Sequence, residues 1–186
     1  MKLIPTSLPD IKILEPTLHG DHRGFFMETW RASTFEDIAP GLRFVQDNHS
    51  KSSKGILRGL HYQLQQPQGK LVRVIAGEIY DVVVDMRRSS PSFGKWVGVV
   101  LSAENHRQLW VPPGFAHGFL VTSESAEMVY KCTDYYAPAY EHSLLWNDPA
   151  LGIEWPLSQL NGAEPVLSDK DRHGRLFKDA LAYDSL

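Results

Sequence analysis

The chain has 186 residues, of which 42% are hydrophobic and 22% are charged, so we expect one domain, residues 1–186, with its own core. Its formal charge of -3 lacks the basic excess that neutralises phosphates, which excludes DNA and RNA as expected partners. The single cysteine, Cys132, excludes an intramolecular disulfide and multi-thiolate metal sites, and no stretch is apolar enough for a signal peptide or membrane span. We therefore expect a cytoplasmic protein with no membrane contact.

Strand patterns dominate the sequence, and helices are expected only at its periphery. In chain order, a capping-box spacing from Ser33 to Glu36 predicts a short helix, and a second short helix is expected after Ser168. Between them, runs of alternating or β-branched residues separated by turn-forming residues predict short strands. The predicted strands are 57–64, 70–76, 79–86, 95–101, 107–111, 115–122 and 127–133. Short strands at short intervals predict an all-β fold, a β-sandwich or jelly roll.

Residues 70–76 and 79–86 carry the clearest strand signal, and we predict that they form a β-hairpin. In the second strand, apolar side chains share one face while Asp81 and Asp85 share the other. This alternation predicts a strand that is buried on one face only.

The predicted strand at 57–64 contains Arg58 and His61 among apolar residues. An imidazole is suited to proton transfer because its unperturbed pKa lies near neutrality, although a histidine can also simply occupy a sheet position. Arg58 and His61 are three residues apart, so a regular strand would direct them to opposite faces. Either a bulge at Gly59 brings both to one cavity, or Arg58 belongs to the preceding loop.

His117 follows the turn Pro112-Pro113-Gly114 at the start of another predicted strand, with a spacing that resembles the second motif of the cupin superfamily. Metal-binding cupins usually also carry a His-x-His pair, which this sequence lacks. Without that pair, imidazole-rich metal coordination loses its main support, and we predict no metal site.

Two further residues have a structural and a functional interpretation. Tyr130 shares a strand face with Met128 and Cys132, so it is either a core residue or an acid in the site. Asp171 either completes a helix start capped by Ser168 or orients His61, and the two roles are compatible.

Six segments in fixed order resemble the dTDP-4-dehydrorhamnose 3,5-epimerase family, over about Ile11 to Asp171. The matching segments are 20–28, 44–50, 57–63, 69–73, 115–119 and 145–149. The resemblance implies a cupin-like jelly roll that epimerises dTDP-4-dehydro-6-deoxy-D-glucose at carbons 3 and 5, without metal or cofactor. It also implies dTDP-L-rhamnose biosynthesis for cell-envelope carbohydrate such as lipopolysaccharide O antigen. The absence of a Gly-rich dinucleotide motif agrees with a reaction that needs no cofactor.

The resemblance implies roles for individual residues. His61 is the base, Asp171 its partner and Tyr130 the acid on the opposite face of the sugar. Lys70, our candidate for stabilising the enolate oxygen, and His117 are expected near the sugar. An aromatic residue, Tyr135, Tyr136 or Phe26, is expected to stack on the thymine. The other expected substrate-binding residues, some across a homodimer interface, are Arg23, Glu28, Gln46, Asp47, Asn48, Arg58, Glu141 and Lys170.

Three alternatives remain open from the sequence. The first is an epimerase of one carbon, or a ketoisomerase, in another dTDP-deoxysugar pathway. The second is a metal cupin that uses His61, His117 and an acid as ligands. The third is a module that binds a sugar nucleotide without turnover.

Overall fold

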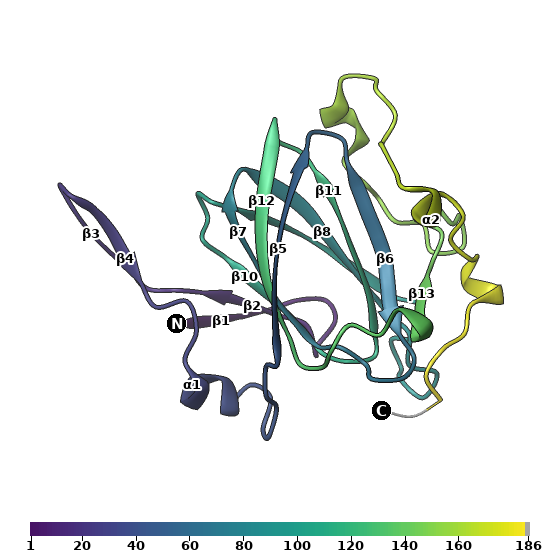
Figure 1. The fold of residues 1–186 in the computed structure, drawn as a ribbon, viewed down its shortest axis with the longest axis horizontal. Helices are drawn as coiled ribbons and strands as arrows, with labels where there is room; N and C mark the ends of the chain where they lie inside the picture. The colour runs from purple at the N-terminus through teal and green to yellow at the C-terminus, as the bar shows by residue number, and fades with distance from the viewer. Residues whose placement is uncertain (185–186) are drawn as a thin grey trace.

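The computed structural model describes residues 1–184, which form two facing antiparallel β-sheets (Figure 1). The predicted single domain, 1–186, includes two residues that lie outside the described ones. The larger sheet consists, in spatial order, of β1 (Lys2–Pro5), β2 (Lys12–Glu15), β10 (Gln108–Val111), β7 (Lys70–Ala76), β12 (Ser125–Cys132) and β5 (Gln46–Ser53). The smaller sheet consists of β13 (Glu141–Ser143), β6 (Leu57–Gln63), β11 (Phe115–Val121), β8 (Glu78–Asp85) and β9 (Trp96–Ser102). These two layers confirm the predicted all-β jelly-roll class.

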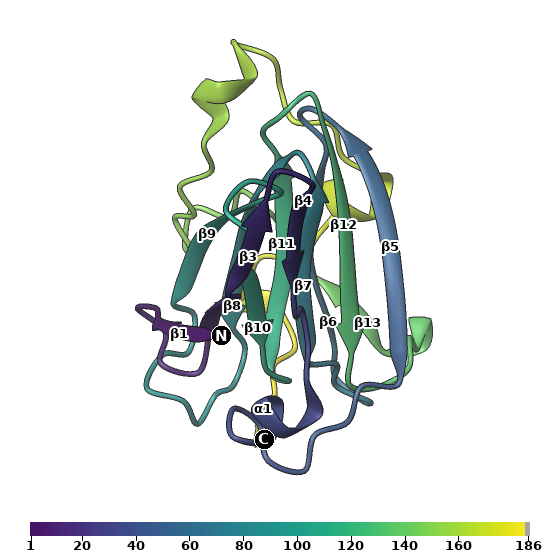
Figure 2. The ribbon, with the colours of Figure 1, turned by 90° about the vertical axis from the view of Figure 1, so that its left-hand side faces the viewer.

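The remaining elements are small and lie outside the two sheets. A hairpin of β3 (Leu18–Asp21) and β4 (Gly24–Met27) extends away from the sandwich in Figure 1 and lies in front of the sheets in the view of Figure 2. The helices are α1 (Ala32–Glu36) and α2 (Asp169–Arg172), and the 3-10 turns are η1 (Pro138–Tyr140), η2 (Leu157–Leu160) and η3 (Phe177–Asp179). The predicted peripheral position of the helices is confirmed.

The main core lies between the two sheets, where alternate side chains of both layers meet. Val72 and Val74 of β7 pack against Val83 of β8 and Leu101 of β9, and all four are almost completely buried. Burying a valine or leucine side chain contributes about 1.5–3 kcal/mol, so this cluster holds the two layers together.

The prediction that residues 70–76 and 79–86 form a hairpin is wrong. Both segments are strands, but β7 pairs with β10 and β12, whereas β8 pairs with β9 and β11. The chain crosses between the sheets at Gly77, whose φ is +73° and where a Cβ atom would lie 1.9 Å from the carbonyl oxygen of Ser125. A corner between sheets and a hairpin both place glycine between two apolar strands, so their sequences look alike.

The prediction that 79–86 is buried on one face only is also wrong. Val82 and Val84 point to the outer face of the smaller sheet and are fully buried there. Leu151, Trp155 and Tyr183 of the C-terminal segment cover that face in the same apolar cluster. The alternation was correctly identified, but the cover comes from residues more than sixty positions later in the chain.

The two predicted helix starts have different outcomes. Ser168 is the N-cap of α2, and its hydroxyl accepts a hydrogen bond from the Asp171 backbone, as predicted. The predicted cap at Ser33 is wrong, because α1 begins at Ala32 and has no side-chain cap. Phe35 instead fixes this single turn by packing edge-on against Trp110, with ring centroids 4.9 Å apart.

Candidate active site

A bulge in β6 directs Arg58 and His61 to the same side of the smaller sheet. His61 lies opposite His117 of β11 and Arg58 opposite Phe119, so three steps along β6 match two along β11. Gly59 absorbs the extra residue with a φ of +119°, and a Cβ atom there would lie 2.4 Å from the backbone of the facing strand. Of the two alternatives for Arg58, the structure has the bulge.

His61 is paired with Asp171 of α2. Its Nε2 atom lies 2.5 Å from Oδ1 of Asp171, and Oδ2 accepts a hydrogen bond of 2.9 Å from the hydroxyl of Ser168. Burial raises the pKa of Asp171, but the hydrogen bond and the charge of His61 outweigh it and hold that pKa below its ordinary value. Asp171 is therefore a charged, buried carboxylate that both completes the helix start and orients the imidazole.

Glu141 lies on the other side of the His61 ring. Its Oε1 is 3.8 Å from Nδ1 of His61, and its Oε2 accepts hydrogen bonds from Nζ of Lys170 at 2.7 Å and from the hydroxyl of Tyr136 at 3.0 Å. The resemblance implied that Glu141 contacts the nucleotide, and the structure places it beside the expected base. Its position at the edge strand β13 gave no signal of this in the sequence.

Tyr130 and Lys70 both belong to the larger sheet and point toward the interior of the sandwich. Tyr130 of β12 packs against the core between the sheets, and burial raises its pKa, so the phenol is protonated at neutral pH. Lys70 of β7 lines a small cavity together with His61 and Glu141. Burial lowers the pKa of Lys70, because the ammonium is separated from bulk water.

A second histidine–carboxylate pair lies directly beside the first. Nε2 of His117 is 2.9 Å from both carboxylate oxygens of Asp81, and both residues are buried. Since His117 is the cross-strand neighbour of His61, the two pairs lie next to each other on the smaller sheet. Asp81 was missed as a site residue, although its place opposite the apolar face of its strand was a signal.

Strand β5, which pairs with β12, supplies two amide side chains next to Tyr130. Asn48 is the cross-strand partner of Tyr130, and Gln46 donates to the Asn48 side chain at 3.1 Å. Gln46 also accepts a hydrogen bond from the backbone N–H of Tyr136 at 3.0 Å, which holds the aromatic segment near the site. The structure therefore brings these three residues together.

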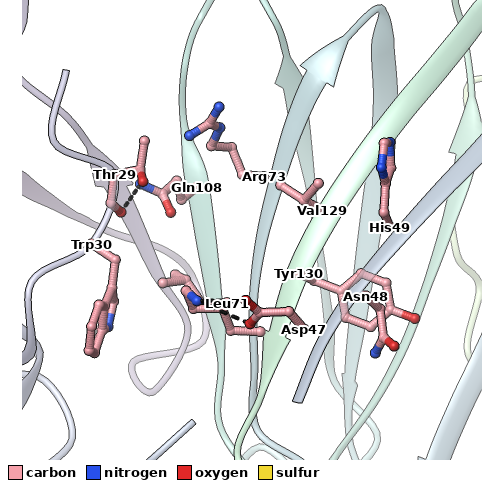
Figure 3. Close-up of a pocket in the computed structure, with 11 residues that line it drawn as sticks. Thr29, Trp30, Asp47, Asn48, His49, Leu71, Arg73, Gln108, Val129 and Tyr130 are labelled. Carbon is pink, nitrogen blue, oxygen red and sulfur yellow. Dashed lines mark hydrogen bonds and ion pairs between the residues drawn. The ribbon is translucent and has the colours of Figure 1, made fainter. Parts of the chain in front are cut away.

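Asp47 points to the opposite face of the larger sheet. It pairs with Lys131 at 3.0 Å beside a pocket that Trp30, Leu71 and Arg73 also line (Figure 3). Figure 3 shows the side chains of Tyr130 and Asn48 directed away from Trp30 and Leu71. The structure thus separates Asp47 from the other expected substrate-binding residues of β5.

The hairpin residues are also separated from His61 within one chain. Arg23 pairs with Asp21 on the hairpin itself, and Glu28 pairs with Arg31. The Phe26 side chain is 70% exposed, on a hairpin that leaves the sandwich (Figure 1). A single chain therefore leaves Arg23, Phe26 and Glu28 outside the cluster around His61.

Within residues 1–184, we find neither a helix suited to crossing a membrane nor three His, Cys, Asp or Glu side chains grouped as ligands for a metal ion. The two histidines of the alternative metal site are engaged by separate carboxylates, His61 by Asp171 and His117 by Asp81. The arrangement as it stands provides bases, acids and cations around one cavity.

Comparison with known proteins identifies the family. The family model described as dTDP-4-dehydrorhamnose 3,5-epimerase matches residues 5–179. The chain belongs to this family. A dTDP-4-dehydrorhamnose 3,5-epimerase of Salmonella typhimurium is 58% identical over 183 residues, 97% of this chain and 98% of that protein. One of Neisseria gonorrhoeae is 57% identical over 97% of this chain, which spans 54% of that longer relative.

Solved structures of family members have the same fold. The dTDP-6-deoxy-D-glucose-3,5-epimerase of Legionella pneumophila, in complex with dTDP-4-keto-L-rhamnose, is 51% identical with a TM-score of 0.94, covering 100% of this chain and 98% of its own. A 3'-monoepimerase of Streptomyces bikiniensis, in complex with dTDP-quinovose, is 38% identical with a TM-score of 0.85, covering 94% and 87%. The family resemblance inferred from sequence is confirmed. The chain is similar in structure both to a 3,5-epimerase and to a 3'-monoepimerase.

Proposed function

We propose that this protein epimerises dTDP-4-dehydro-6-deoxy-D-glucose at carbons 3 and 5 to dTDP-4-dehydro-L-rhamnose, in dTDP-L-rhamnose biosynthesis. The observation that carries the proposal is the 2.5 Å pairing of His61 with the buried Asp171, beside the cavity that Lys70 also lines. The names of the full-length relatives and the keto-sugar in the Legionella pneumophila complex, which is the product of this reaction, support the same activity.

The chemistry follows from the ketone at carbon 4, which acidifies the hydrogens on carbons 3 and 5. His61 removes one of these protons, and the negative charge moves to the ketone oxygen as an enolate. Tyr130, whose raised pKa keeps it protonated, returns a proton from the opposite face, which inverts the carbon. No hydride moves, so the reaction requires no redox cofactor.

Lys70 and His117 are the groups that we assign to the ketone oxygen. Lys70 lines the small cavity together with His61, and the buried His117 is the cross-strand neighbour of His61. Removing a preplaced donor of this kind typically costs about 2.7–4 kcal/mol of transition-state stabilisation. Asp81 fixes the His117 ring, as Asp171 fixes His61.

The nucleotide and diphosphate occupy the open side of this cavity. We assign Arg58 and Lys170 to the diphosphate because their cations border the His61 cluster. Gln46 and Asn48 face the same space, and Tyr136, held by Gln46, is positioned to stack on the thymine. Asp47, on the opposite sheet face, has no place in this assignment.

We further propose a homodimer in which the β3–β4 hairpin of each chain completes the partner's site. The hairpin carries exposed Phe25 and Phe26 away from its own sandwich. Among the described residues, β5, which includes Gln46 and Asn48, is an edge strand of the larger sheet and has a neighbouring strand on one side only. An exposed apolar hairpin and a free edge strand are complementary in a twofold arrangement. Arg23, Phe26 and Glu28 would then reach the nucleotide of the partner.

We place this activity in the cytoplasm, where the free, buried Cys132 requires no oxidising environment. The product would supply a pathway to cell-envelope carbohydrate such as lipopolysaccharide O antigen. Neither nucleic acid nor membrane takes part in this proposal.

The experiment is incubation with dTDP-4-dehydro-6-deoxy-D-glucose in heavy water, after metal removal, with a reductase to trap the product. We expect deuterium at carbons 3 and 5 and an L-rhamnose product, detected by NMR. Label at one carbon would instead support the single-carbon alternative, which the similarity to the Streptomyces bikiniensis monoepimerase favours as second candidate. Binding without any exchange would overturn both.

A further inference from the structure

Double inversion sets a requirement that His61 and Tyr130 alone do not meet. Each inversion leaves His61 with one additional proton and Tyr130 with one fewer, because one proton leaves the sugar on one face and another enters on the other. A second inversion needs a neutral imidazole and a protonated phenol again. One proton must therefore leave His61, and one must return to Tyr130, between the two inversions.

Asp171 offers no exit for this proton. Its side chain is 3% exposed, one oxygen is occupied by His61, and the other is occupied by the hydroxyl of Ser168. A proton transferred to Asp171 would remain in a buried pair and could not reach water. The exit must lie on the Nδ1 side of the imidazole ring.

Glu141 is the group on that side, and it spans the boundary between cavity and solvent. Oε1 lies 3.8 Å from Nδ1 of His61, about 1 Å beyond a hydrogen bond and within reach of a small side-chain rotation. Oε2 is held by Lys170, whose side chain is 49% exposed, and by Tyr136, which is 51% exposed. The described contacts thus lead from the base through one carboxylate to water.

We propose that Glu141 is the proton exit of this site, which takes the Nδ1 proton of His61 after each inversion and releases it to water beside Lys170. The proposal rests on the proposed function, in which His61 is the base and Tyr130 the acid. Tyr130 takes up one proton from solvent for each proton that Glu141 releases, so the net count is unchanged. The charges that face Glu141 are His61, Lys170 and, more remotely, Lys70.

The charge state of Glu141 suits this role. Burial raises the pKa of Glu141, but the hydrogen bond from Lys170 and the charges of His61 and Lys170 outweigh it, so the pKa lies below its ordinary value. The carboxylate is therefore ionised at neutral pH and ready to accept a proton. Protonated Glu141 is short-lived beside Lys170, which favours release over storage.

The test is a single-turnover experiment in heavy water with Glu141→Gln, which keeps the shape and removes the proton acceptor. We expect the rate of exchange at the second carbon, divided by the rate at the first, to fall at least about tenfold below the wild-type ratio, so that singly inverted sugar accumulates. Glu78→Gln is the matched control, because Glu78 is a half-buried carboxylate that instead accepts from Thr122. This control should exchange both carbons at the wild-type rate.

A second variant separates proton transfer from structural support. In Glu141→Ala, added formate should restore exchange at the second carbon in a saturable manner, because a small carboxylate can occupy the vacated space. Equal slowing at both carbons, or a raised KM with an unchanged ratio of label at the two carbons, would overturn the exit and assign Glu141 to orientation or nucleotide binding. Wild-type protein without exchange at either carbon would contradict the proposed function itself.

Discussion

Nε2 of His61 and Oδ1 of Asp171 lie 2.5 Å apart, although 110 residues separate them in the chain. Because a charged carboxylate only accepts hydrogen bonds, it holds the proton of the neutral imidazole on Nε2. Nδ1 is then the unprotonated nitrogen, and it faces the cavity shared with Lys70 and Glu141. In the proposed mechanism, Nδ1 is therefore the nitrogen that acts as the base.

Replacing Asp171 with asparagine should expose this dependence. The amide no longer favours one tautomer and does not stabilise the imidazolium, so we expect kcat to fall about 10²–10⁴-fold. KM should change less than about threefold, because Asp171 contacts His61 rather than the sugar nucleotide. Steady-state kinetics with a coupled reductase measures both values.

Ser168→Ala is the control for this variant. It removes only the hydrogen bonds of the cap, so we expect a loss of about 1 kcal/mol in the free energy of unfolding and a kcat within about tenfold of wild type. A raised KM with unchanged kcat in Asp171→Asn would contradict the assigned role.

Asp81→Asn tests the second pair. His117 would lose the carboxylate that holds its ring. We expect kcat to fall about 10–100-fold, the usual range when a group that orients a functional histidine is removed. Asp85→Asn is matched to it, since Asp85 lies on the same strand face but binds Arg87 and Ser90 rather than a histidine. Equal losses of kcat per folded protein in the two variants would argue against a role for His117 at the sugar.

Asp85 should instead govern acid stability. Burial raises its pKa, but hydrogen bonds from Arg87 and Ser90 outweigh this, so its folded pKa lies below the unfolded value of about 3.9. The unfolded chain therefore binds the proton at higher pH, and this stabilisation is complete above that value and lost as pH falls through the folded pKa.

For Asp85→Asn, we expect the free energy of unfolding at pH 7 to fall by about 2 kcal/mol, the range for hydrogen bonds to a charged group. Urea denaturation of wild type and variant from pH 7 down to pH 2 measures the difference. The gap between them should narrow as the pH falls below about 4. A gap independent of pH would show that the ionised carboxylate is not its source.

Most of the β-structure could be predicted from the sequence, because its strands are long enough to show a period of two. The predicted strands 57–64 and 115–122 each match β6 and β11 to within one residue. Strands β1 to β4 and β13 were missed because they have only three or four residues, too few for periodicity to distinguish them from loops. The eight-residue β5 was missed because its side chains are polar on both faces. The strand partners of β7 and β8 were predicted wrongly, because the sheet that a strand joins depends on contacts with residues far away in the chain.

In the site, too, features marked by a local sequence pattern could be predicted, and features that depend on long-range contacts could not. A local pattern suggested the bulge at Gly59 and the cap at Ser168, and both are present. The positions of Glu141 and Asp81 beside histidines could not be predicted, since they depend on which strands become neighbours across the smaller sheet. Sequence spacing contains no information on such long-range contacts unless a family resemblance supplies it.

Shared sites in the proposed dimer predict that two inactive variants complement each other. His61→Ala removes the base, and a second variant with Arg23→Ala and Phe26→Ala removes the hairpin contacts. In a mixed dimer, the chain with an intact His61 receives an intact hairpin from its partner, so one of its two sites is complete. Random re-association makes half of the dimers mixed, so about a quarter of the wild-type activity should return.

Dissociation and remixing of the separately purified variants, followed by the heavy-water assay, measures this fraction. Each variant remixed with itself is the control and should remain inactive; no recovery despite verified mixed dimers would place the hairpin in its own chain's site.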